Sequence, residues 1–263
     1  MGIKDNKKIL KFCKTKRPLV CLTAYTSYMA EILDNDCDAI LVGDSLSMVI
    51  YGESSTATVS LQTMIKHGKA VAKGVKKSLL IIDMPRGSYE KSSKWALKNA
   101  KKIIKETNCD AVKVEGGTKI KKIIKTLVAN KIPVMGHIGL LPQQALKPND
   151  YKVKGRTEEE EKIIIEDLKA VQESGAFSVV IEAVPKVLAD KLCKISKIKT
   201  IGIGASKNCD GQILVTEDML GFFVKNAKFV KKYENMRYRI IKSIQKFKSD
   251  IIKRKFPTQK NVY

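Results

Sequence analysis

Charged and polar side chains stand at the ends of several short apolar runs in this sequence. The runs are rich in β-branched and aliphatic residues, as strands are. The side chains at or near their ends belong to Asp44, Ser45, Asp83, Lys113, Glu115, His137 and Glu182. In a parallel barrel the carboxyl ends of all strands meet at one mouth. We therefore expect four carboxylates and one lysine to converge there.

The four carboxylates, those of Asp44, Asp83, Glu115 and Glu182, together predict a site for a cation. Taken singly, an aspartate after a strand is more often a helix cap or a turn former. Together they offer hard oxygen ligands, and no cysteine or histidine spacing typical of zinc accompanies them. Such ligands suit Mg²⁺, which prefers carboxylates and water in an octahedral shell. The metal would leave positions open for a substrate.

Lys113 lies between Val112 and Val114 inside an apolar run. Its side chain should therefore enter the barrel or contact a helix, and a buried ammonium needs an anionic partner. Glu182 similarly follows the unbroken apolar run 179–181. The positions of both residues therefore indicate a role in chemistry at the predicted mouth and not ordinary solvent-exposed charges.

Eight runs predict the strands that position these side chains. They cover residues 18–22, 38–42, 79–83, 111–115, 133–137, 178–182, 200–203 and 212–215. Helical periodicity fills the stretches between them, as in residues 118–130, where five apolar residues share one helical face. A second helix is expected between Thr157, which stands at capping-box spacing from Glu160, and Gly175, which would end it.

Strand and helix alternate without a break, which implies parallel pairing and right-handed crossovers. Eight units in about 220 residues suit a closed barrel better than an open doubly wound sheet. No GxGxxG or P-loop follows the first strand, so the usual nucleotide-binding reason for the open sheet is missing. We expect a single α/β domain over residues 1–263, a (β/α)8 TIM barrel with a short N-terminal extension and a basic C-terminal helix, residues 233–254, followed by a tail.

The formal net charge of +23 first suggests a nucleic-acid partner. However, only six of the 50 basic residues are arginine, the residue that bidentate phosphate and base recognition favours. The lysines are spread along predicted helices, where they would form a solvated face. We therefore do not expect nucleic-acid binding, although the positive field could steer anionic substrates.

Cysteine usage and hydropathy predict the compartment. The six cysteines form no CxxC and no paired spacing, so we expect all six to be reduced. No apolar run reaches the roughly 18 to 20 residues that span a bilayer, and the N-terminus lacks the features of a signal peptide. A soluble cytoplasmic protein without a membrane partner is expected.

Eight blocks of the sequence, in order, resemble the ketopantoate hydroxymethyltransferase family. The resemblance covers nearly the whole chain and is carried by LTAYTSYMAEILD, LVGDSLSMV, IIDMPRGSY, AVKVEGG, VMGHIGLLPQ, YKVKGR, SGAFSVVIEAVP and IGIGASKNCDGQILV. It implies a one-carbon transferase of pantothenate biosynthesis that moves a hydroxymethyl group from 5,10-methylene-tetrahydrofolate to 3-methyl-2-oxobutanoate, giving 2-dehydropantoate (ketopantoate) through a Mg²⁺-stabilised enolate. It also implies a homo-oligomer, commonly a decamer.

The resemblance also implies roles for single residues. Asp44, Asp83 and Glu115 would bind Mg²⁺, Glu182 would accept the substrate proton, and Asp44, Ser45, Asp83 and Lys113 would hold the substrate. The sequence departs from the family pattern at several positions, among them Ser47, Glu53, Ser54, Arg86, Leu141, Ser206 and Asn261. None of these removes an expected ligand, but Arg86 could alter contacts to folate or substrate.

Two other functions remain open at this point. The barrel could belong to another Mg²⁺-dependent enzyme that stabilises enolates of 2-oxo acids, of the phosphoenolpyruvate mutase and isocitrate lyase type. Activity on phosphonopyruvate or isocitrate without folate would favour it. It could instead be an inactive barrel that binds nucleic acid, although the four intact carboxylates argue against that.

Overall fold

The computed structural model describes residues 6–145, 147 and 150–263. Within them, eight parallel strands follow one another around a closed barrel in chain order, and the last strand pairs with the first. The strands are β1 (Leu19–Thr23), β2 (Ala39–Val42), β3 (Leu79–Asp83), β4 (Ala111–Lys113), β5 (Val134–Gly139), β6 (Ser178–Glu182), β7 (Lys199–Ile203) and β8 (Gly211–Leu214). The predicted (β/α)8 TIM barrel is confirmed.

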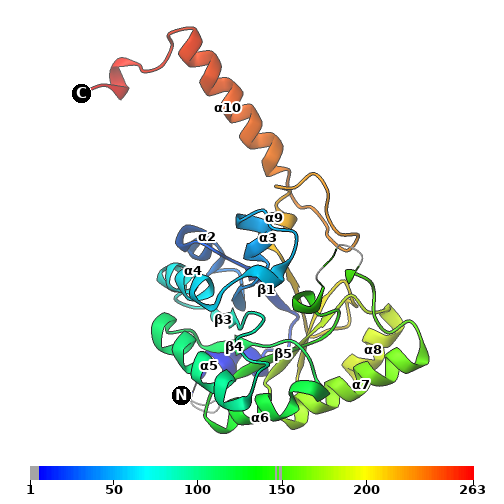
Figure 1. Ribbon diagram of the computed structural model, residues 1–263. Helices are drawn as coiled ribbons and strands as arrows, with labels where there is room; N and C mark the ends of the chain where they lie inside the picture. Colours follow the sequence, from blue (N-terminus) through cyan, green and yellow to red (C-terminus); the bar gives the residue numbers. More distant parts are fainter. Residues whose placement is uncertain (1–5, 146, 148–149) are drawn as a thin grey trace. The chain divides into compact units, whose positions relative to one another are not determined.

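The chain forms two compact units, Met1–Val215 and Thr216–Tyr263, and the barrel belongs to the first. Helices of the first unit surround the strands (Figure 1). The helices of this unit are α1 (Lys7–Lys14), α2 (Ser27–Leu33), α3 (Leu46–Ile50), α4 (Leu61–Gly74), α5 (Ser93–Thr107), α6 (Lys121–Ala129), α7 (Glu158–Glu173) and α8 (Lys186–Ile195), with the short 3-10 helices η1 (Thr56–Thr58), η2 (Thr118–Ile120) and η3 (Pro142–Gln144).

Successive side chains of each strand point alternately into the barrel and toward the helices, so the protein has two apolar cores. On β3, Leu79 and Ile81 pack in the barrel interior, whereas Leu80 and Ile82 pack in the layer between the strands and the helices. Because successive side chains of a strand point to opposite faces, Asp83 shares the interior face with Leu79 and Ile81. The same alternation on neighbouring strands places their charged residues above the apolar interior of the barrel.

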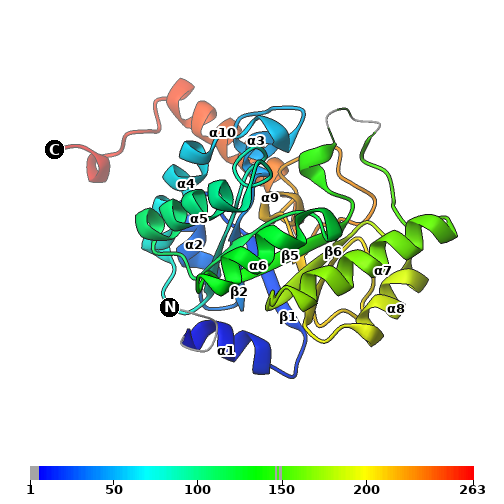
Figure 2. The same ribbon diagram turned by 60° about the horizontal axis from the view of Figure 1, so that its bottom comes forward.

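Helix α1 closes the end of the barrel at which the strands begin. Its buried residues Ile9 and Phe12 belong to the interior core, and the ring of Phe12 meets that of Phe177 edge-on at 5.9 Å. Figure 2 shows α1 across this end of the barrel. Asn6 caps the helix by accepting hydrogen bonds from the backbone of Lys8 and Ile9. The expected N-terminal extension is therefore a plug, and the site must use the opposite mouth.

The strands lie within one or two residues of the predicted ranges. Strand β4 ends two residues earlier than predicted, at Lys113, so Glu115 stands in the loop that follows and not in the strand. The predicted helix at 118–130 begins instead as η2 and continues as α6. At α7, Thr157 caps the helix as expected, but the Glu160 carboxylate accepts from the backbone of Gly155 and Arg156.

The second unit contains α9 (Thr216–Met219), α10 (Met236–Ile252) and η5 (Gln259–Asn261). The basic C-terminal helix begins three residues later than predicted, because the Asn235 side chain caps it by accepting from Tyr238 N. That the whole chain is one domain stays a prediction. None of the helices in the described residues is long and apolar enough to cross a membrane.

Candidate active site

The pairing of β3 with β4 builds the centre of the site. Asp83 and Lys113 are register partners, and Lys113 Nζ lies 2.9 Å from Asp83 Oδ1. Both side chains are almost completely buried, with exposed fractions of 2% and 5%. The anionic partner that the buried lysine requires is therefore its neighbour across the sheet.

Three further groups extend this pair across β5 and β6. Glu115 Oε1 is 3.8 Å from Lys113 Nζ and 3.4 Å from His137 Nδ1. His137 Nε2 lies 3.2 Å from Glu182 Oε2 on the next strand. Lys113 Nζ also lies 3.2 Å from His137 Nδ1. A neutral His137 can accept from Lys113, whereas an imidazolium can donate to both glutamates. The five groups form one connected cluster at the C-terminal mouth of the barrel.

Asp44 joins the cluster through the loop after β2. Its backbone N–H donates to Asp83 Oδ2 at 3.1 Å, and its side chain accepts from Gln143 Nε2 at 2.8 Å. Gln143 belongs to η3, and its backbone N–H donates to Glu115 Oε2 at 3.0 Å. Tyr89 donates its hydroxyl to Gln143 Oε1 at 2.8 Å. Gln143 therefore connects two predicted metal ligands that are 71 residues apart in the chain.

Ser45 stands at the edge of the site and is half-buried. Its Oγ and the hydroxyl of Tyr25 are 2.8 Å apart. The nearby Gly43 is explained by sterics, because the Cβ atom of any other residue at this position would lie 2.7 Å from Ser45 Oγ. Among the departures from the family pattern, Ser47 binds Ser55 O and Thr58 through its hydroxyl. Ser47 thus fastens α3 to η1 in this chain.

The electrostatics of the cluster show an excess of negative charge. Burial raises the pKa of Asp44 well above its usual value, and the charges of Asp83 and Glu115 raise it further. Burial also raises the pKa of Asp83, although Lys113 opposes this. Burial acts against the ionised form of Glu115 too, but His137 and Lys113 outweigh it and its pKa is lowered.

The two basic groups, His137 and Lys113, have raised pKa values because their acidic neighbours outweigh the effect of burial. Burial and Lys113 oppose protonation of His137, but Glu115 and Glu182 outweigh them and raise its pKa to about 9. Burial likewise opposes the charge on Lys113, and Asp83 and Glu115 raise its pKa. Even with both bases protonated, four carboxylates face two positive charges. A divalent cation would balance that excess.

The donor set suits a hard cation. Carboxylate oxygens of Asp44, Asp83 and Glu115 are connected within the cluster, and Glu115 Oε1 is buried without a hydrogen-bond partner among the described residues. In the described part of the chain, no three His, Cys, Asp or Glu side chains already surround one metal position. Lys113 Nζ contacts two of these carboxylates, Asp83 at 2.9 Å and Glu115 at 3.8 Å. The residues present fit Mg²⁺ by charge and chemistry.

All predicted site residues lie at the same mouth, and sequence reasoning missed several of their partners. The sequence pattern places His137 at a strand end but indicates no role for it, and it does not indicate Gln143, Tyr89 or Tyr25. Each of the four lies within a sequence block that carries the family resemblance. A polar residue inside such a block, far from any strand end, was the signal that could have found Gln143.

A parallel (β/α)8 barrel with buried acid and base groups at its C-terminal mouth defines an enzyme of the TIM-barrel class. A family model described as ketopantoate hydroxymethyltransferase matches residues 4–259. A 3-methyl-2-oxobutanoate hydroxymethyltransferase of Pelagibacter ubique is 52% identical over 260 residues, 98% of this chain and 100% of that protein. Its counterpart in Maricaulis maris is 49% identical over 95% of this chain and 90% of that protein. The chain belongs to the ketopantoate hydroxymethyltransferase family and is an enzyme of the hydroxymethyltransferase type.

Solved structures of other enzymes share the fold. A phosphonopyruvate hydrolase in complex with oxalate and Mg²⁺ superposes with a TM-score of 0.62 at 13% identity and covers 99% of this chain and 93% of its own. A phosphoenolpyruvate phosphomutase from Streptomyces platensis subsp. rosaceus reaches 0.64 at 10% identity, over 96% and 88%. At such identities the likeness is one of fold. The relationship in sequence is to the ketopantoate hydroxymethyltransferases.

Proposed function

We propose that this protein transfers a hydroxymethyl group from 5,10-methylene-tetrahydrofolate to 3-methyl-2-oxobutanoate, giving 2-dehydropantoate. The observation that carries the proposal is the full-length match to relatives of that name, 52% identical in the first case. The cluster supplies suitable groups for the chemistry, namely a buried ammonium, a histidine and several carboxylates at one mouth. A cytoplasmic enzyme of pantothenate biosynthesis follows from the proposal.

Glu182 is the proposed proton acceptor at C3 of the 2-oxo acid. It is the least buried carboxylate of the cluster, with its side chain 13% exposed, so it is accessible from the mouth. The ring of His137, whose Nε2 lies 3.2 Å from Glu182 Oε2, would position this carboxylate. Loss of the C3 proton leaves an enolate, whose carbon forms a bond to the methylene carbon of the folate as one carbon–nitrogen bond of that methylene group breaks. Hydrolysis of the adduct breaks the second carbon–nitrogen bond, so that water supplies the product hydroxyl and tetrahydrofolate leaves.

Asp44, Asp83 and Glu115 are the proposed ligands of Mg²⁺. When bound there, the cation would polarise the keto oxygen of the substrate and acidify the C3 proton. Lys113 and Ser45 would bind the carboxylate or keto end of the 2-oxo acid, together with Asp44 and Asp83 through the metal. Support comes from the buried ammonium of Lys113 and from the negative excess around it.

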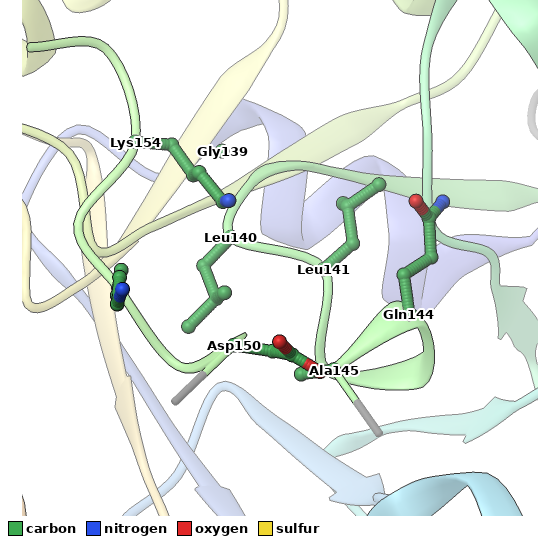
Figure 3. A pocket seen from close by; sticks show the side chains of 8 residues that line it. Gly139, Leu140, Leu141, Gln144, Ala145, Asp150 and Lys154 are labelled. Carbon is green, nitrogen blue, oxygen red and sulfur yellow. The ribbon is translucent and has the colours of Figure 1, made fainter. Parts of the chain in front are cut away.

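A cavity next to the cluster is the proposed folate site. It has a volume of about 500 Å³, within the range of small-molecule sites. In Figure 3, Leu140 and Leu141 lie between Lys154 on one side and Gln144 on the other. The leucines suit the flat pterin ring, and Lys152 and Lys154 suit the glutamate carboxylates of the folate. Leu140 N donates to Glu182 O, which links this wall to the proposed base.

The substrate assignment is tested by a competition between 2-oxo acids. Purified protein, Mg²⁺ and ¹³C-labelled methylene-tetrahydrofolate are incubated with 3-methyl-2-oxobutanoate, 2-oxobutanoate or phosphonopyruvate, and products are identified by mass spectrometry. We expect a labelled one-carbon gain that is greatest for 3-methyl-2-oxobutanoate. Turnover of phosphonopyruvate without folate would place the protein with the enzymes that share only its fold.

We also propose that the protein is a homo-oligomer. None of the residues of α10 is buried, and its exposed apolar side chains include Ile240, Ile241, Ile244, Phe247 and Ile251. An apolar face of that kind on a soluble helix favours a protein partner. Light scattering coupled to size exclusion should give a mass well above 29.3 kDa, a decamer by family resemblance. A monomer at micromolar concentration would contradict the proposal.

A further inference from the structure

Two cysteines outside the carboxylate cluster lie in contact. Cys193 Sγ and Cys209 Sγ are 3.4 Å apart and share a hydrogen bond. Cys193 belongs to α8, and Cys209 to the segment 204–210 that connects β7 to β8. All six cysteines are free thiols. Two thiols in contact need only a small side-chain movement to reach the sulfur–sulfur distance of a disulfide, about 2.05 Å.

The backbone around both cysteines is already fixed. The segment 204–210 contains no helix, and side chains fasten it to α8 instead. Asp190 of α8 accepts hydrogen bonds from Ser206 Oγ and, at 2.8 Å, from Asn208 Nδ2. These bonds hold the segment against the turns of α8 that carry Cys193. The contact between the thiols is therefore maintained by hydrogen bonds between segment 204–210 and α8. It does not depend on a chance approach of two mobile segments.

The two thiols differ in exposure and in acidity. Cys193 is half-buried, whereas Cys209 is 4% exposed. The hydrogen bond with Cys209 lowers the pKa of Cys193 to about 7 despite burial, and Thr200 Oγ1, at 3.6 Å, contributes. The same bond and burial raise the pKa of Cys209. The more accessible sulfur is thus the one with thiolate character, and thiolates are the reactive form.

We propose that Cys193 and Cys209 are a peroxide-responsive pair that forms a reversible disulfide. The Cys193 thiolate attacks one oxygen of hydrogen peroxide, the O–O bond breaks, and hydroxide leaves, so that Cys193 becomes a sulfenic acid. The Cys209 sulfur then attacks the Cys193 sulfur, its proton and the sulfenic hydroxyl leave as water, and the disulfide forms. Each sulfur loses one electron, and the peroxide gains two. A dithiol returns the pair to the reduced form.

The disulfide would tie the helix-free crossover to α8. It would close a loop between residues 193 and 209, which restricts the unfolded chain. The reduced protein already holds the two segments together, so oxidation is expected to leave the barrel in place and raise its melting temperature. The pair stays reduced under ordinary cytoplasmic conditions and responds when peroxide accumulates.

The test compares Cys193 with Cys13, which is also half-buried but has no thiol partner among the described residues. Burial raises the pKa of Cys13. Full-length protein is treated with hydrogen peroxide, alkylated, digested without reductant and analysed by mass spectrometry. We expect a cross-linked peptide containing Cys193 and Cys209, and a melting temperature that rises on oxidation and returns with dithiothreitol. At pH 7.5, Cys193 should be alkylated at least about tenfold faster than Cys13.

Variants distinguish the role of Cys193, which peroxide oxidises, from that of Cys209, which completes the disulfide. Cys193→Ser should lose the cross-link and the thermal shift, whereas Cys13→Ser should keep both. Cys209→Ser should leave a sulfenic acid on Cys193 that dimedone traps. The proposal is overturned if peroxide gives no cross-link in the folded wild-type protein, or if Cys193 reacts no faster than Cys13. It is equally overturned if the cross-link forms only after denaturation.

Discussion

Asp83 and Lys113 are register partners on neighbouring strands, and their charged groups meet 2.9 Å apart inside the barrel. A slip of one residue between β3 and β4 would send one of the two side chains to the helix layer. The apolar residues below them, Leu79, Ile81 and Ala111, fix that register by filling the interior. The ion pair at the centre of the site is thus specified by the packing of the core beneath it.

Removing the lysine should leave a buried charge without a counterion. We expect Lys113→Met to lower the free energy of unfolding by about 3 to 5 kcal/mol, the range found when one partner of a buried pair is lost. Denaturant unfolding without metal measures this. Lys69→Met is the matched control, because Lys69 pairs with Glu106 at the surface and should change little. Equal effects of the two substitutions would show that the Asp83–Lys113 pair carries no special stability.

Removing a carboxylate should have the opposite effect on stability. Burial, Asp83 and Glu115 raise the pKa of Asp44 well above 3.8, so its charge is unfavourable in the metal-free protein. Asp44→Asn can still accept from Gln143, and we expect it to stabilise the metal-free protein by about 1 to 3 kcal/mol at pH 7. It should also abolish any stabilisation by added Mg²⁺.

The pH dependence of Asp44 follows from the direction of its shift. The native state keeps this proton to higher pH than the unfolded state, so the contribution of Asp44 to wild-type stability falls as pH rises above 3.8. The gap between Asp44→Asn and wild type should therefore widen from acid to neutral pH. Thermal melts in EDTA measure it, and a variant less stable than wild type at pH 7 would contradict the assignment.

Asp34 gives the reverse case away from the site. Burial acts to raise its pKa, but hydrogen bonds from the backbone of Ser78, Lys76 and Lys77 outweigh it and the pKa is lowered. Asp34→Asn should cost about 2 kcal/mol at pH 7, since bonds to a charged acceptor are lost. The stabilisation by Asp34 is present above 3.8 and is lost as pH falls through its lowered native pKa. The difference from wild type should then vanish in acid, while exposed Asp36→Asn differs at neither pH.

The proposed base is tested by isotope exchange. Glu182→Gln keeps the size of the side chain and a contact to His137 but cannot accept the C3 proton. We expect retained binding of 3-methyl-2-oxobutanoate and a loss of C3 deuterium exchange by about 10² to 10⁴-fold. Glu173→Gln, which alters a surface pair with Lys121, is the control. Unchanged exchange in Glu182→Gln would identify another group as the base.

The barrel and most of the cluster could be predicted from the sequence because both follow from the alternation of side chains along a strand, in which every second residue faces the barrel interior. An apolar run that ends in a charge places that charge above the core, as at Asp83 and Glu182. Gln143 could not be found this way. It lies in a 3-10 helix after β5, and its bond to Asp44 joins residues 99 apart. Such a contact depends on how two loops meet, which strand patterns do not specify.

Both halves of the proposed reaction can be followed by NMR of 3-methyl-2-oxobutanoate in D₂O with the purified protein. Samples contain Mg²⁺ or EDTA, each with and without 5,10-methylene-tetrahydrofolate. We predict C3 deuterium exchange that requires Mg²⁺ but not folate, and 2-dehydropantoate only when both are present. Exchange undiminished by EDTA would contradict the metal assignment. A folded, Mg²⁺-loaded protein that gave neither exchange nor product would contradict the proposed function itself.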